Sequence, residues 1–357
     1  MKVALLAGAN AIHTIRWANG LVHVGIDVHL ISAHHLGHEL DSRVVLHSLP
    51  YGAGFGYFTN TIALKRLLDE IGPDILNAHY ASGYGTLARL AGFSPYLLSV
   101  WGSDVYDFPE KSPIHHWLIA GNLRAADSVA STSECMLRRT RRVAGDVPAY
   151  VTPFGVDESL FCPAEKQFRG NEFVIGTVKT LALKYGVDTL IDAFAIVWRT
   201  LGKPANLYLE VTGDGPQCRA LELKVTELGV ADQVRFFGRV THDSVPDMLR
   251  RLDVYVALSR EESFGVAILE ASACGLPVVV SDADGPAEVV LDGETGVIVP
   301  RDRPDLAAKA LMQLFNDSGL RERMGQAGRQ HVLVNYTWHD SVRRMVDAYK
   351  DLISKVA

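Results

Sequence analysis

The sequence predicts an α/β protein made of two open domains, each built around its own parallel sheet. Short apolar runs that suit strands alternate with amphipathic segments that suit helices along most of the chain, which is the pattern of parallel strands joined by crossover helices. The pattern restarts with a new strand-like run at 173–179. A chain of 357 residues is also long enough to form two hydrophobic cores.

The first half of the chain accounts for one sheet. Its expected strands are the apolar runs 3–7, 27–32, 44–47, 75–79, 96–101, 128–132 and 149–152. Its expected helices are the amphipathic segments 14–24, 60–71, 85–91 and 113–125. Each helix lies between two of these strands, as a parallel sheet requires.

The second half accounts for the other sheet. Its expected strands are 173–179, 206–212, 234–238, 254–257 and 277–281, with helices over 187–198 and from about Gly265. The polar, turn-rich segment 161–172 predicts a linker, which gives domains of residues 1–165 and 166–335 and a final segment 336–357. Two such domains would face each other across a cleft, with ligand contacts at the carboxyl ends of the strands.

Composition limits the class of protein. A net charge of −6 argues against a general nucleic-acid binder. The four cysteines show neither CxxC nor Cys/His metal-ligand spacing, so we expect a reducing cytoplasm, no disulfide framework and no metal site. The opening MKVALLAGAN suits a buried strand better than a signal peptide, and no apolar run reaches the ~18–20 residues of a membrane span, so any membrane contact would be peripheral.

The segment 259–275 carries the strongest functional signal. Glu262 lies just before a helix that begins near Gly265, and Glu270 lies inside it, roughly 10 Å away at ~1.5 Å rise per residue. The free backbone amides and positive dipole end at such a helix start suit a phosphate. The two carboxylates would then accept hydrogen bonds from a sugar and a ribose, with Ser263, Phe264, Gly265 and Val266 acting through their backbone. Alternatively, Glu262 is an exposed loop carboxylate and Glu270 a helix-surface or salt-bridged residue.

These motifs together resemble the retaining glycosyltransferases of family 4. The similar blocks are 261–300, 175–194, 211–216 and 234–240 and, more loosely, 8–13, 74–81 and 101–104. The resemblance implies a GT-B fold of two Rossmann-like domains, with an N-terminal acceptor-binding domain, a C-terminal donor domain and a final helix that crosses back to the first domain. It further implies a hexosyltransferase without metal or cofactor, whose donor is a nucleotide diphosphate sugar, most often a UDP-sugar. The acceptor would be a saccharide or a lipid-linked molecule in surface polysaccharide or glycolipid assembly.

Two lysines are candidates for neutralising the leaving diphosphate. Lys179 ends an expected strand and Lys184 lies in the loop before a helix, where cations can converge on a phosphate. The related family usually has arginine at the first position, and a lysine keeps the charge without the bidentate fork. Solvated surface lysines are the alternative. Three further donor-site candidates follow strands: Gly213, Gly238 and Arg239.

The N-terminal half offers a smaller set of candidates. Gly8 and His13 follow the first expected strand, and similar loops in the family approach the donor sugar and the acceptor. His79, at a strand end, would orient an acceptor hydroxyl, although a structural histidine is equally consistent with the sequence. Asp104 would bind sugar hydroxyls. Trp101 stands where the family frequently has histidine, so it would either shape the pocket or fill the core.

Two questions stay open at this stage. The arginines at 138, 139, 141 and 142 form either a solvated basic face or a surface that docks on anionic lipid headgroups. A nucleotide-sugar epimerase of the same architecture, or an inactive nucleotide-binding subunit, would also fit two such domains. The intact block 263–275 argues against the epimerase, and the retained glutamates and lysines argue against an inactive subunit.

Overall fold

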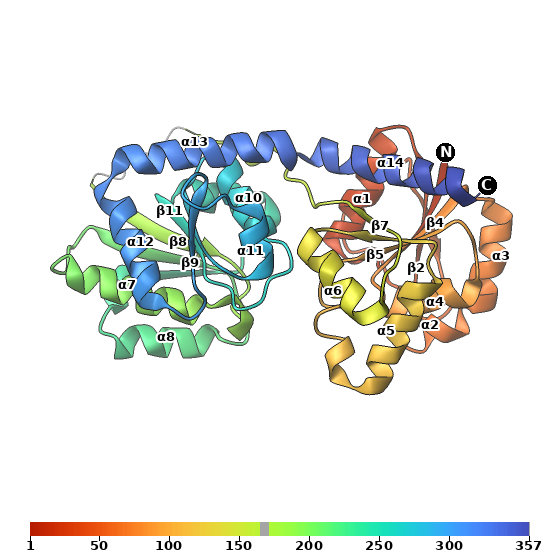
Figure 1. Ribbon diagram of the computed structural model, residues 1–357, viewed down its shortest axis with the longest axis horizontal. Helices are drawn as coiled ribbons and strands as arrows, with labels where there is room; N and C mark the ends of the chain where they lie inside the picture. The colour runs from red at the N-terminus through yellow and green to blue at the C-terminus, as the bar shows by residue number, and fades with distance from the viewer. Residues whose placement is uncertain (165–170, 357) are drawn as a thin grey trace. The chain divides into compact units, whose positions relative to one another are not determined.

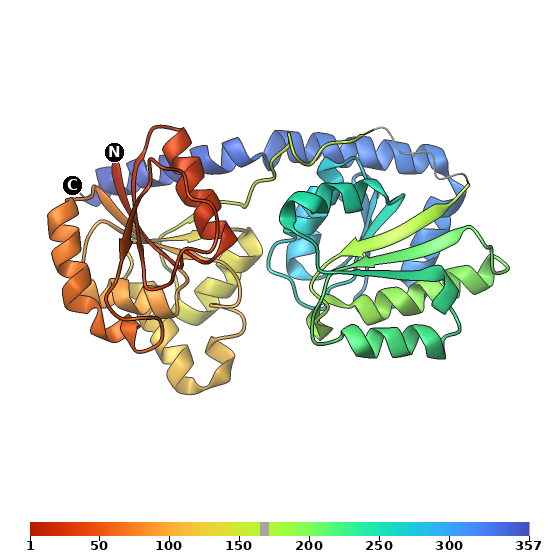
Figure 2. The same ribbon diagram turned by 180° about the vertical axis from the view of Figure 1, so that it is seen from behind.

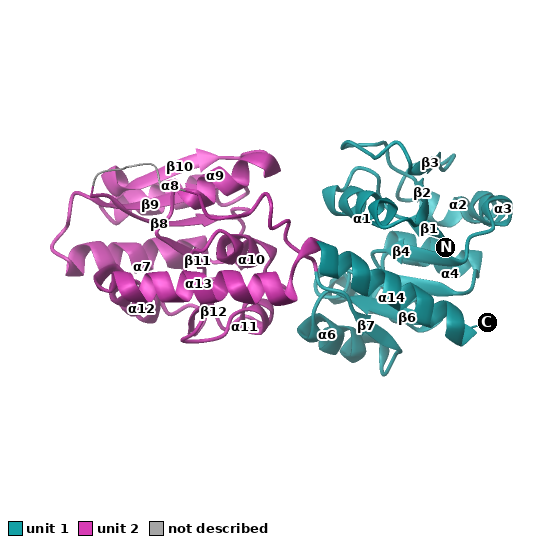
Figure 3. Ribbon diagram, turned by 90° about the horizontal axis from the view of Figure 1, so that it is seen from above, with its two compact units in different colours: residues 1–153, 339–357 teal, residues 154–338 magenta. Residues whose placement is uncertain are grey.

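The computed structural model describes residues 1–164 and 171–356, which form two compact units. One unit consists of residues 1–153 and 339–357 and the other of residues 154–338 (Figure 3). Each unit holds one sheet, and all pairings between strands in both sheets are parallel. The predicted architecture of two parallel α/β domains is confirmed.

The first unit contains a seven-stranded sheet in the order β3-β2-β1-β4-β5-β6-β7 (Figure 1). Its strands are β1 (Lys2–Leu6), β2 (Asp27–Ser32), β3 (Val45–Ser48), β4 (Ile75–His79), β5 (Tyr96–Val100), β6 (Ser128–Ser131) and β7 (Ala149–Val151). Its helices are α1 (Ile12–His23), α2 (Gly56–Thr59), α3 (Thr61–Ile71), α4 (Gly83–Ala91), α5 (Pro113–Ala125), α6 (Glu134–Ala144) and α14 (Trp338–Val356). Helices cover both faces, so β4 and β5 are buried at every position, which explains their unbroken apolar runs.

The second unit contains a six-stranded sheet in the order β10-β9-β8-β11-β12-β13. Its strands are β8 (Phe173–Val178), β9 (Leu207–Thr212), β10 (Val234–Gly238), β11 (Val254–Ala257), β12 (Val278–Ser281) and β13 (Gly296–Val299). Its helices are α7 (Val187–Thr200), α8 (Cys218–Glu227), α9 (Val245–Arg250), α10 (Val266–Ala273), α11 (Asp284–Val289), α12 (Pro304–Asn316) and α13 (Ser318–Asn335). Helices α7 and α8 pack together on one face of the sheet, and α10 and α13 pack on the other (Figure 2).

Local signals in the sequence explain several helix starts. The hydroxyl of Ser133 accepts a hydrogen bond from the backbone amide of Met136 at the start of α6, and the carboxylate of Asp317 does the same for Leu320 in α13. Ser112 caps α5, which has proline at its first position. Strand β13 was not among the expected strands, because its run of four residues follows a turn-rich stretch.

The division between the units differs from the prediction. The expected boundary at 165/166 falls on residues outside the described part of the chain, and the compact units divide instead at Pro153/Phe154 and Trp338/His339. Residues 154–164 belong to the second unit because Val156 exchanges backbone hydrogen bonds of 2.8 Å with Tyr336 and Trp338. Arg250 also donates to the carbonyl oxygen of Leu160. The described residues before the expected linker therefore pack on the second unit.

Each sheet has one point where the strand order reverses, between β1 and β4 in the first unit and between β8 and β11 in the second. The loops that leave neighbouring strands at such a point run in opposite directions and open a crevice beyond the carboxyl ends. The segments 179–186 and 258–265 leave β8 and β11 in this way, and segments 7–11 and 80–82 leave β1 and β4. The sequence candidates lie largely on these loops.

Candidate functional site

The carboxyl edge of the second sheet brings the predicted lysines and glutamates together. The backbone amides of Arg260 and Glu261 donate to the carbonyl oxygen of Lys184 at 2.8 and 3.2 Å. These hydrogen bonds join the loop that carries Lys184 to the segment that carries Glu262. The two loops at the reversal point therefore form one structure.

Lys179 and Glu262 form an ion pair, and each side chain is 10% exposed. The second carboxylate oxygen of Glu262 accepts a hydrogen bond of 2.7 Å from the hydroxyl of Ser259. The alternative of an exposed loop carboxylate is therefore wrong for Glu262, since its side chain is largely buried and both its oxygens have protein partners. Its role as a ligand for sugar hydroxyls stays a prediction. This ion pair holds the Lys179 ammonium group at the edge of the sheet.

An aromatic ring that sequence reasoning missed lies close to both predicted cations. The Tyr185 ring centroid is 4.6 Å from Nζ of Lys179 and 5.5 Å from Nζ of Lys184. Ammonium groups at this distance are attracted by the negative face of the ring. Both lysines therefore interact with the same aromatic side chain, that of Tyr185. The sequence signal that could have pointed to this ring is that tyrosine directly follows Lys184.

Helix α10 begins directly after Gly265, whose φ of +115° is a conformation that side chains disfavour. Phe264 is buried, and its ring packs near those of Phe154 and Tyr336. Gly285 approaches this segment closely: its amide donates to the carbonyl oxygen of Glu262 at 2.9 Å, and a Cβ there would lie 2.3 Å from the nitrogen of Phe264. The backbone before α10 is thus held by the aromatic rings around Phe264 and by the close approach of Gly285. Sequence reasoning did not single out Gly285.

Glu270 lies on α10 and is 8% exposed. Burial, followed by the negative charges of Glu262 and Glu270, raises the pKa of Tyr255, whose hydroxyl lies 3.4 Å from the carbonyl oxygen of Val178. The two glutamates thus lie near the buried Tyr255 of β11, whose hydroxyl reaches the end of β8. Glu270 is therefore an internal carboxylate, and the alternative of a helix-surface residue is wrong.

Gly213 and Gly238 shape the neighbouring loops and present no side chain. Gly213 has a φ of +138°, and a Cβ there would lie 1.8 Å from the carbonyl oxygen of Lys179. Its amide donates to the carbonyl oxygen of Gly238 at 2.8 Å. The glycine therefore allows the ends of β8, β9 and β10 to approach one another. Arg239 is exposed at the same edge.

At the reversal point of the first sheet, the structure gathers His13, His79 and Trp101. The Trp101 ring centroid is 4.4 Å from that of His79 and 5.9 Å from that of His13. His79 is 1% exposed, and burial, followed by the charge of His13, lowers its pKa to about 3. Gly8 lies in the same loop region, where an added Cβ would come 3.0 Å from Oδ1 of Asn10.

The carboxylate of Asp104 is held by backbone amides of the protein itself. It is buried, and its carboxylate accepts hydrogen bonds from the backbone amides of Ala81, Trp101 and Gly102 at 2.9, 3.1 and 2.9 Å. Burial raises its pKa, and these amide hydrogen bonds oppose that effect. In the structure the carboxylate clamps the loops after β4 and β5 together, and its binding of sugar hydroxyls stays a prediction.

The four arginines near 140 do not form one basic face. Arg139 turns inward: it donates to the carbonyl oxygen of Val105 at 3.1 Å and pairs with Glu110. Arg141 lies 3.3 Å from Asp146. Arg138 and Arg142 are exposed.

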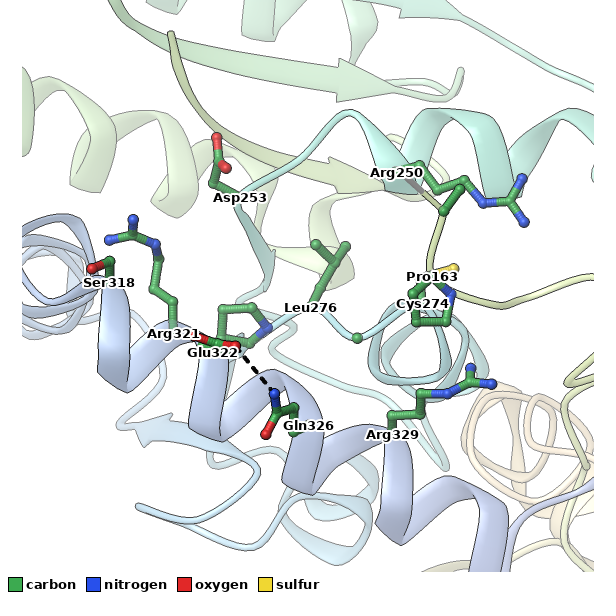
Figure 4. A pocket seen from close by; sticks show the side chains of 13 residues that line it. Pro163, Arg250, Asp253, Cys274, Leu276, Ser318, Arg321, Glu322, Gln326 and Arg329 are labelled. Carbon is green, nitrogen blue, oxygen red and sulfur yellow. Dashed lines mark hydrogen bonds between the residues drawn. The ribbon is translucent and has the colours of Figure 1, made fainter. Parts of the chain in front are cut away.

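A cavity of about 520 Å³ in the second unit lies away from the carboxyl edge that carries Lys179 and Glu262 (Figure 4). Asp253 and Pro277, which line it, precede β11 and β12, so it opens at the amino edge of the sheet. The arginines on its wall are engaged by the protein, as when Arg321 donates to the carbonyl oxygen of Phe315 at 3.1 Å. The predicted donor residues do not line this cavity.

Within residues 1–164 and 171–356, no three His, Cys, Asp or Glu side chains are grouped so that they could hold a metal ion. No helix in the same ranges is long and apolar enough to cross a bilayer.

Comparisons with known proteins identify the family of this chain. Residues 161–331 match the family model for glycosyl transferases group 1, and residues 2–133 match that for glycosyl transferase 4-like proteins. A GDP-mannose-dependent alpha-(1-6)-phosphatidylinositol monomannoside mannosyltransferase of Mycolicibacterium smegmatis is 30% identical over 305 residues, covering 80% of this chain and 78% of that protein. An N-acetyl-alpha-D-glucosaminyl L-malate synthase of Bacillus anthracis is 26% identical over 317 residues, covering 84% and 81%.

Solved structures show the same fold. Sucrose-phosphate synthase from Thermosynechococcus elongatus superposes with a TM-score of 0.85 at 20% identity, over 99% of this chain and 100% of that chain. Anabaena Alr3699/HepE in complex with UDP gives a TM-score of 0.84 at 17% identity, with the same coverage. The chain therefore belongs to the group 1, family-4-like glycosyltransferases and has their GT-B fold.

Proposed function

We propose that the protein is a retaining, metal-independent hexosyltransferase that moves a sugar from a nucleotide diphosphate sugar, by preference a UDP-sugar, to a saccharide or lipid-linked acceptor. One observation carries the proposal: Lys179 and Lys184 share the Tyr185 ring beside Glu262 at the carboxyl edge of the second sheet. The complexes of Anabaena HepE with UDP and with UDP-glucose support the choice of donor.

The two lysines and the start of α10 would stabilise the leaving diphosphate. An ammonium group has three donors, so Lys179 would keep its bond to Glu262 while it binds a phosphate oxygen. Lys184 and the backbone amides of Gly265 and Val266 would add positive potential where negative charge develops. This electrostatic stabilisation supplies much of the rate enhancement in such sites.

The anomeric configuration of the sugar is retained if the acceptor attacks the same face of the sugar that the diphosphate leaves. Departure would give an oxocarbenium-like sugar, and an oxygen of the departing phosphate would accept the proton of the attacking hydroxyl. No protein nucleophile is then required. Glu270 would bind the donor rather than react with it.

The donor is tested by the thermal stabilisation that ligands of the folded state produce. UDP-, GDP- and ADP-sugars are compared, because the mycobacterial relative is named for GDP-mannose. We expect the largest rise in Tm with a UDP-sugar; a larger rise with GDP-mannose would overturn the UDP assignment. Appearance of an isomer of the sugar without any acceptor would instead indicate an epimerase.

Configuration and metal dependence need separate measurements. NMR of the product is expected to show the anomeric configuration of the donor, and transfer is expected to persist in excess EDTA. An inverted linkage would refute the retaining mechanism. Loss of transfer in EDTA with recovery on adding Mg²⁺ would refute metal independence.

We also propose that the enzyme works in the cytoplasm, peripherally on the inner face of the membrane, in the assembly of surface polysaccharide or glycolipid. The exposed Arg138 and Arg142 on α6 would contact anionic headgroups, each worth about 1 kcal/mol near the surface. The double charge removal Arg138→Gln and Arg142→Gln should weaken binding to phosphatidylglycerol vesicles. The matched control is Arg141→Gln, which breaks the pair with Asp146; equal binding by all variants would remove this idea.

A further inference from the structure

A buried chain of hydrogen bonds in the first unit links the C-terminal helix to a histidine of the candidate acceptor site. Oη of Tyr349, on α14, lies 2.9 Å from Oδ1 of Asn77, and the same Oδ1 lies 3.2 Å from Nε2 of His79. All three residues are at most 1% exposed. Asn77 is the middle residue of β4 and His79 is its last, beside the reversal point of the sheet.

The orientation of the Asn77 amide follows from its other contacts. Its nitrogen Nδ2 lies 3.1 Å from the carbonyl oxygen of Leu97 and 2.9 Å from the hydroxyl of Ser99. Because a backbone carbonyl only accepts, the atom that faces Leu97 must be the amide nitrogen. Oδ1 therefore faces Tyr349 and His79, and both must donate to it. His79 consequently carries a proton on Nε2.

The other ring nitrogen of His79 is left as an acceptor. In a neutral imidazole only one nitrogen carries hydrogen, so Nδ1 has a free lone pair. Nδ1 is buried and has no hydrogen-bond partner among the residues that the structure describes. Burial and the nearby His13 keep the pKa of the ring far below neutrality, so the ring stays neutral at physiological pH. A buried acceptor without a donor costs free energy, which a ligand hydroxyl would recover.

We propose that Asn77 and Tyr349 are positioning residues that hold His79 in the Nε2–H tautomer, so that Nδ1 accepts a hydrogen bond from a hydroxyl of the acceptor sugar. The role in acceptor binding rests on the proposed transferase function, whereas the tautomer does not. Trp101 lies against the His79 ring, so the hydroxyl reaches Nδ1 when the Trp101 ring turns aside. Since Tyr349 belongs to α14, the packing of this helix on the first unit contributes to the acceptor site.

The tautomer is measured directly by ¹⁵N NMR of the histidine rings in the full chain, without substrate. The His79 signals are identified by their loss in His79→Gln. We expect a protonated Nε2 and an unprotonated Nδ1 that do not change between pH 5 and 8. A protonated Nδ1, or titration of this ring within that range, would overturn the proposal.

Removal of the Asn77 amide and the Tyr349 hydroxyl tests whether these groups set the tautomer of His79. The double variant Asn77→Leu with Tyr349→Phe replaces both partners by apolar groups, which avoids leaving the Tyr349 hydroxyl unpaired. We expect a mixture of tautomers and an at least fivefold lower kcat/KM for the acceptor, with the donor KM within twofold of wild type. Tyr349→Phe alone, which keeps Asn77, should show the same changes to a smaller degree and remains informative where the double variant does not fold.

The matched control is Tyr96→Phe. Tyr96 is also a buried tyrosine of the first sheet, and its hydroxyl has no hydrogen-bond partner among the described residues. This variant should keep the wild-type tautomer and kinetics. Wild-type tautomer and acceptor kinetics in the Asn77 and Tyr349 variants would refute the proposal. Absence of any sugar transfer by the wild-type chain would refute the proposed function, while the NMR result would still decide the tautomer.

Discussion

Lys179 and Glu262 are the two residues on which the donor edge most depends. They pair in a site where each side chain is largely buried, and Ser259 holds the second oxygen of the carboxylate. A buried charge whose partner is removed is costly, whereas removal of both charges is tolerated better. The pair therefore contributes to stability and to donor binding in different ways.

A double-mutant cycle separates these contributions. Lys179→Met should lower the free energy of unfolding by about 3 kcal/mol because it leaves the Glu262 carboxylate unpaired. Adding Glu262→Gln should recover most of this loss, while donor binding stays impaired in both variants. Urea denaturation and donor titration measure the two effects. Equal stability of the single and double variants would argue against the ion pair.

Glu270 makes a second prediction at the residue scale. Glu270→Ala should lower kcat/KM for the donor by at least about tenfold, because it removes a carboxylate that the proposed site uses for binding. The control is Glu261→Ala, which removes an exposed carboxylate of the same block. If both variants lose the same activity, a general effect of charge explains the result and the assignment of Glu270 fails.

At the scale of elements, the strand ends of the second sheet depend on glycine where they approach one another. A Cβ at Gly213 would lie 1.8 Å from the carbonyl oxygen of Lys179, so the β9 loop or the end of β8 must move to accept one. Gly213→Ala should therefore cost about 3 kcal/mol, and displace Lys179. Gly229 also has a positive φ but has nothing within 4 Å of the added Cβ, so Gly229→Ala should cost only about 1 kcal/mol. Comparable losses in urea denaturation would contradict the steric argument.

Arg260 joins two elements of the donor edge. Its guanidinium binds both oxygens of Asp188, at 2.8 and 2.7 Å, and lies 2.7 Å from Asp302. Burial raises the pKa of Asp188, but the Arg260 guanidinium outweighs this effect and the net shift is downward. This arrangement fixes the start of α7 against the segment before Glu262.

Loss of this link should affect donor binding more than it affects stability. Arg260→Ala is expected to raise the donor KM about tenfold, while the free energy of unfolding falls by about 1–2 kcal/mol. Steady-state kinetics with varied donor and urea denaturation measure the two effects. Arg303→Ala, which breaks the exposed pair with Asp305, should change neither quantity. An unchanged donor KM in Arg260→Ala would show that the link does not position the lysine loop.

At the scale of the whole molecule, buried histidines should make the protein sensitive to acid. The pKa of His79 is about 3 in the folded chain, against an ordinary value of 6.5. Below pH 6.5 the unfolded chain binds a proton at this ring that the folded chain does not bind. The free energy of unfolding therefore falls as pH falls, by up to about 1.4 kcal/mol per pH unit, until the folded ring titrates near pH 3. Above pH 6.5 the ring contributes no pH dependence.

His79→Gln tests this linkage. Between pH 7 and 5 the wild-type chain should lose about 2 kcal/mol more stability than the variant, as measured by urea denaturation. Burial also lowers the pKa values of His34, His47 and His331. These histidines make the stability of both proteins depend on pH to the same extent. Equal losses in the two proteins would mean that His79 is protonated alike in the folded and unfolded states.

Much of the architecture was predictable from local pattern. The strands of the first sheet are apolar runs bounded by turn residues, and the segment 113–125 carries both a serine cap and a proline at its start. The start of α10 was predictable because Gly265 precedes a regular helical pattern. The domain boundary was not, because Val156 joins the second unit through backbone hydrogen bonds that its side chain does not encode.

The sequence by itself determined the fold class, the family resemblance and the set of charged residues around Glu262, since periodicity and motif spacing are properties of the chain alone. Only the tertiary structure decided how those residues are used. It paired Lys179 with Glu262, placed Tyr185 beside two lysines, and turned Asp104 inward to bind backbone amides. It also joined Tyr349 to His79 through Asn77. Tyr349 lies 272 positions from Asn77 along the chain, and His79 lies 2 positions from it. Such contacts depend on which strands and helices meet in space, and a linear pattern does not specify that.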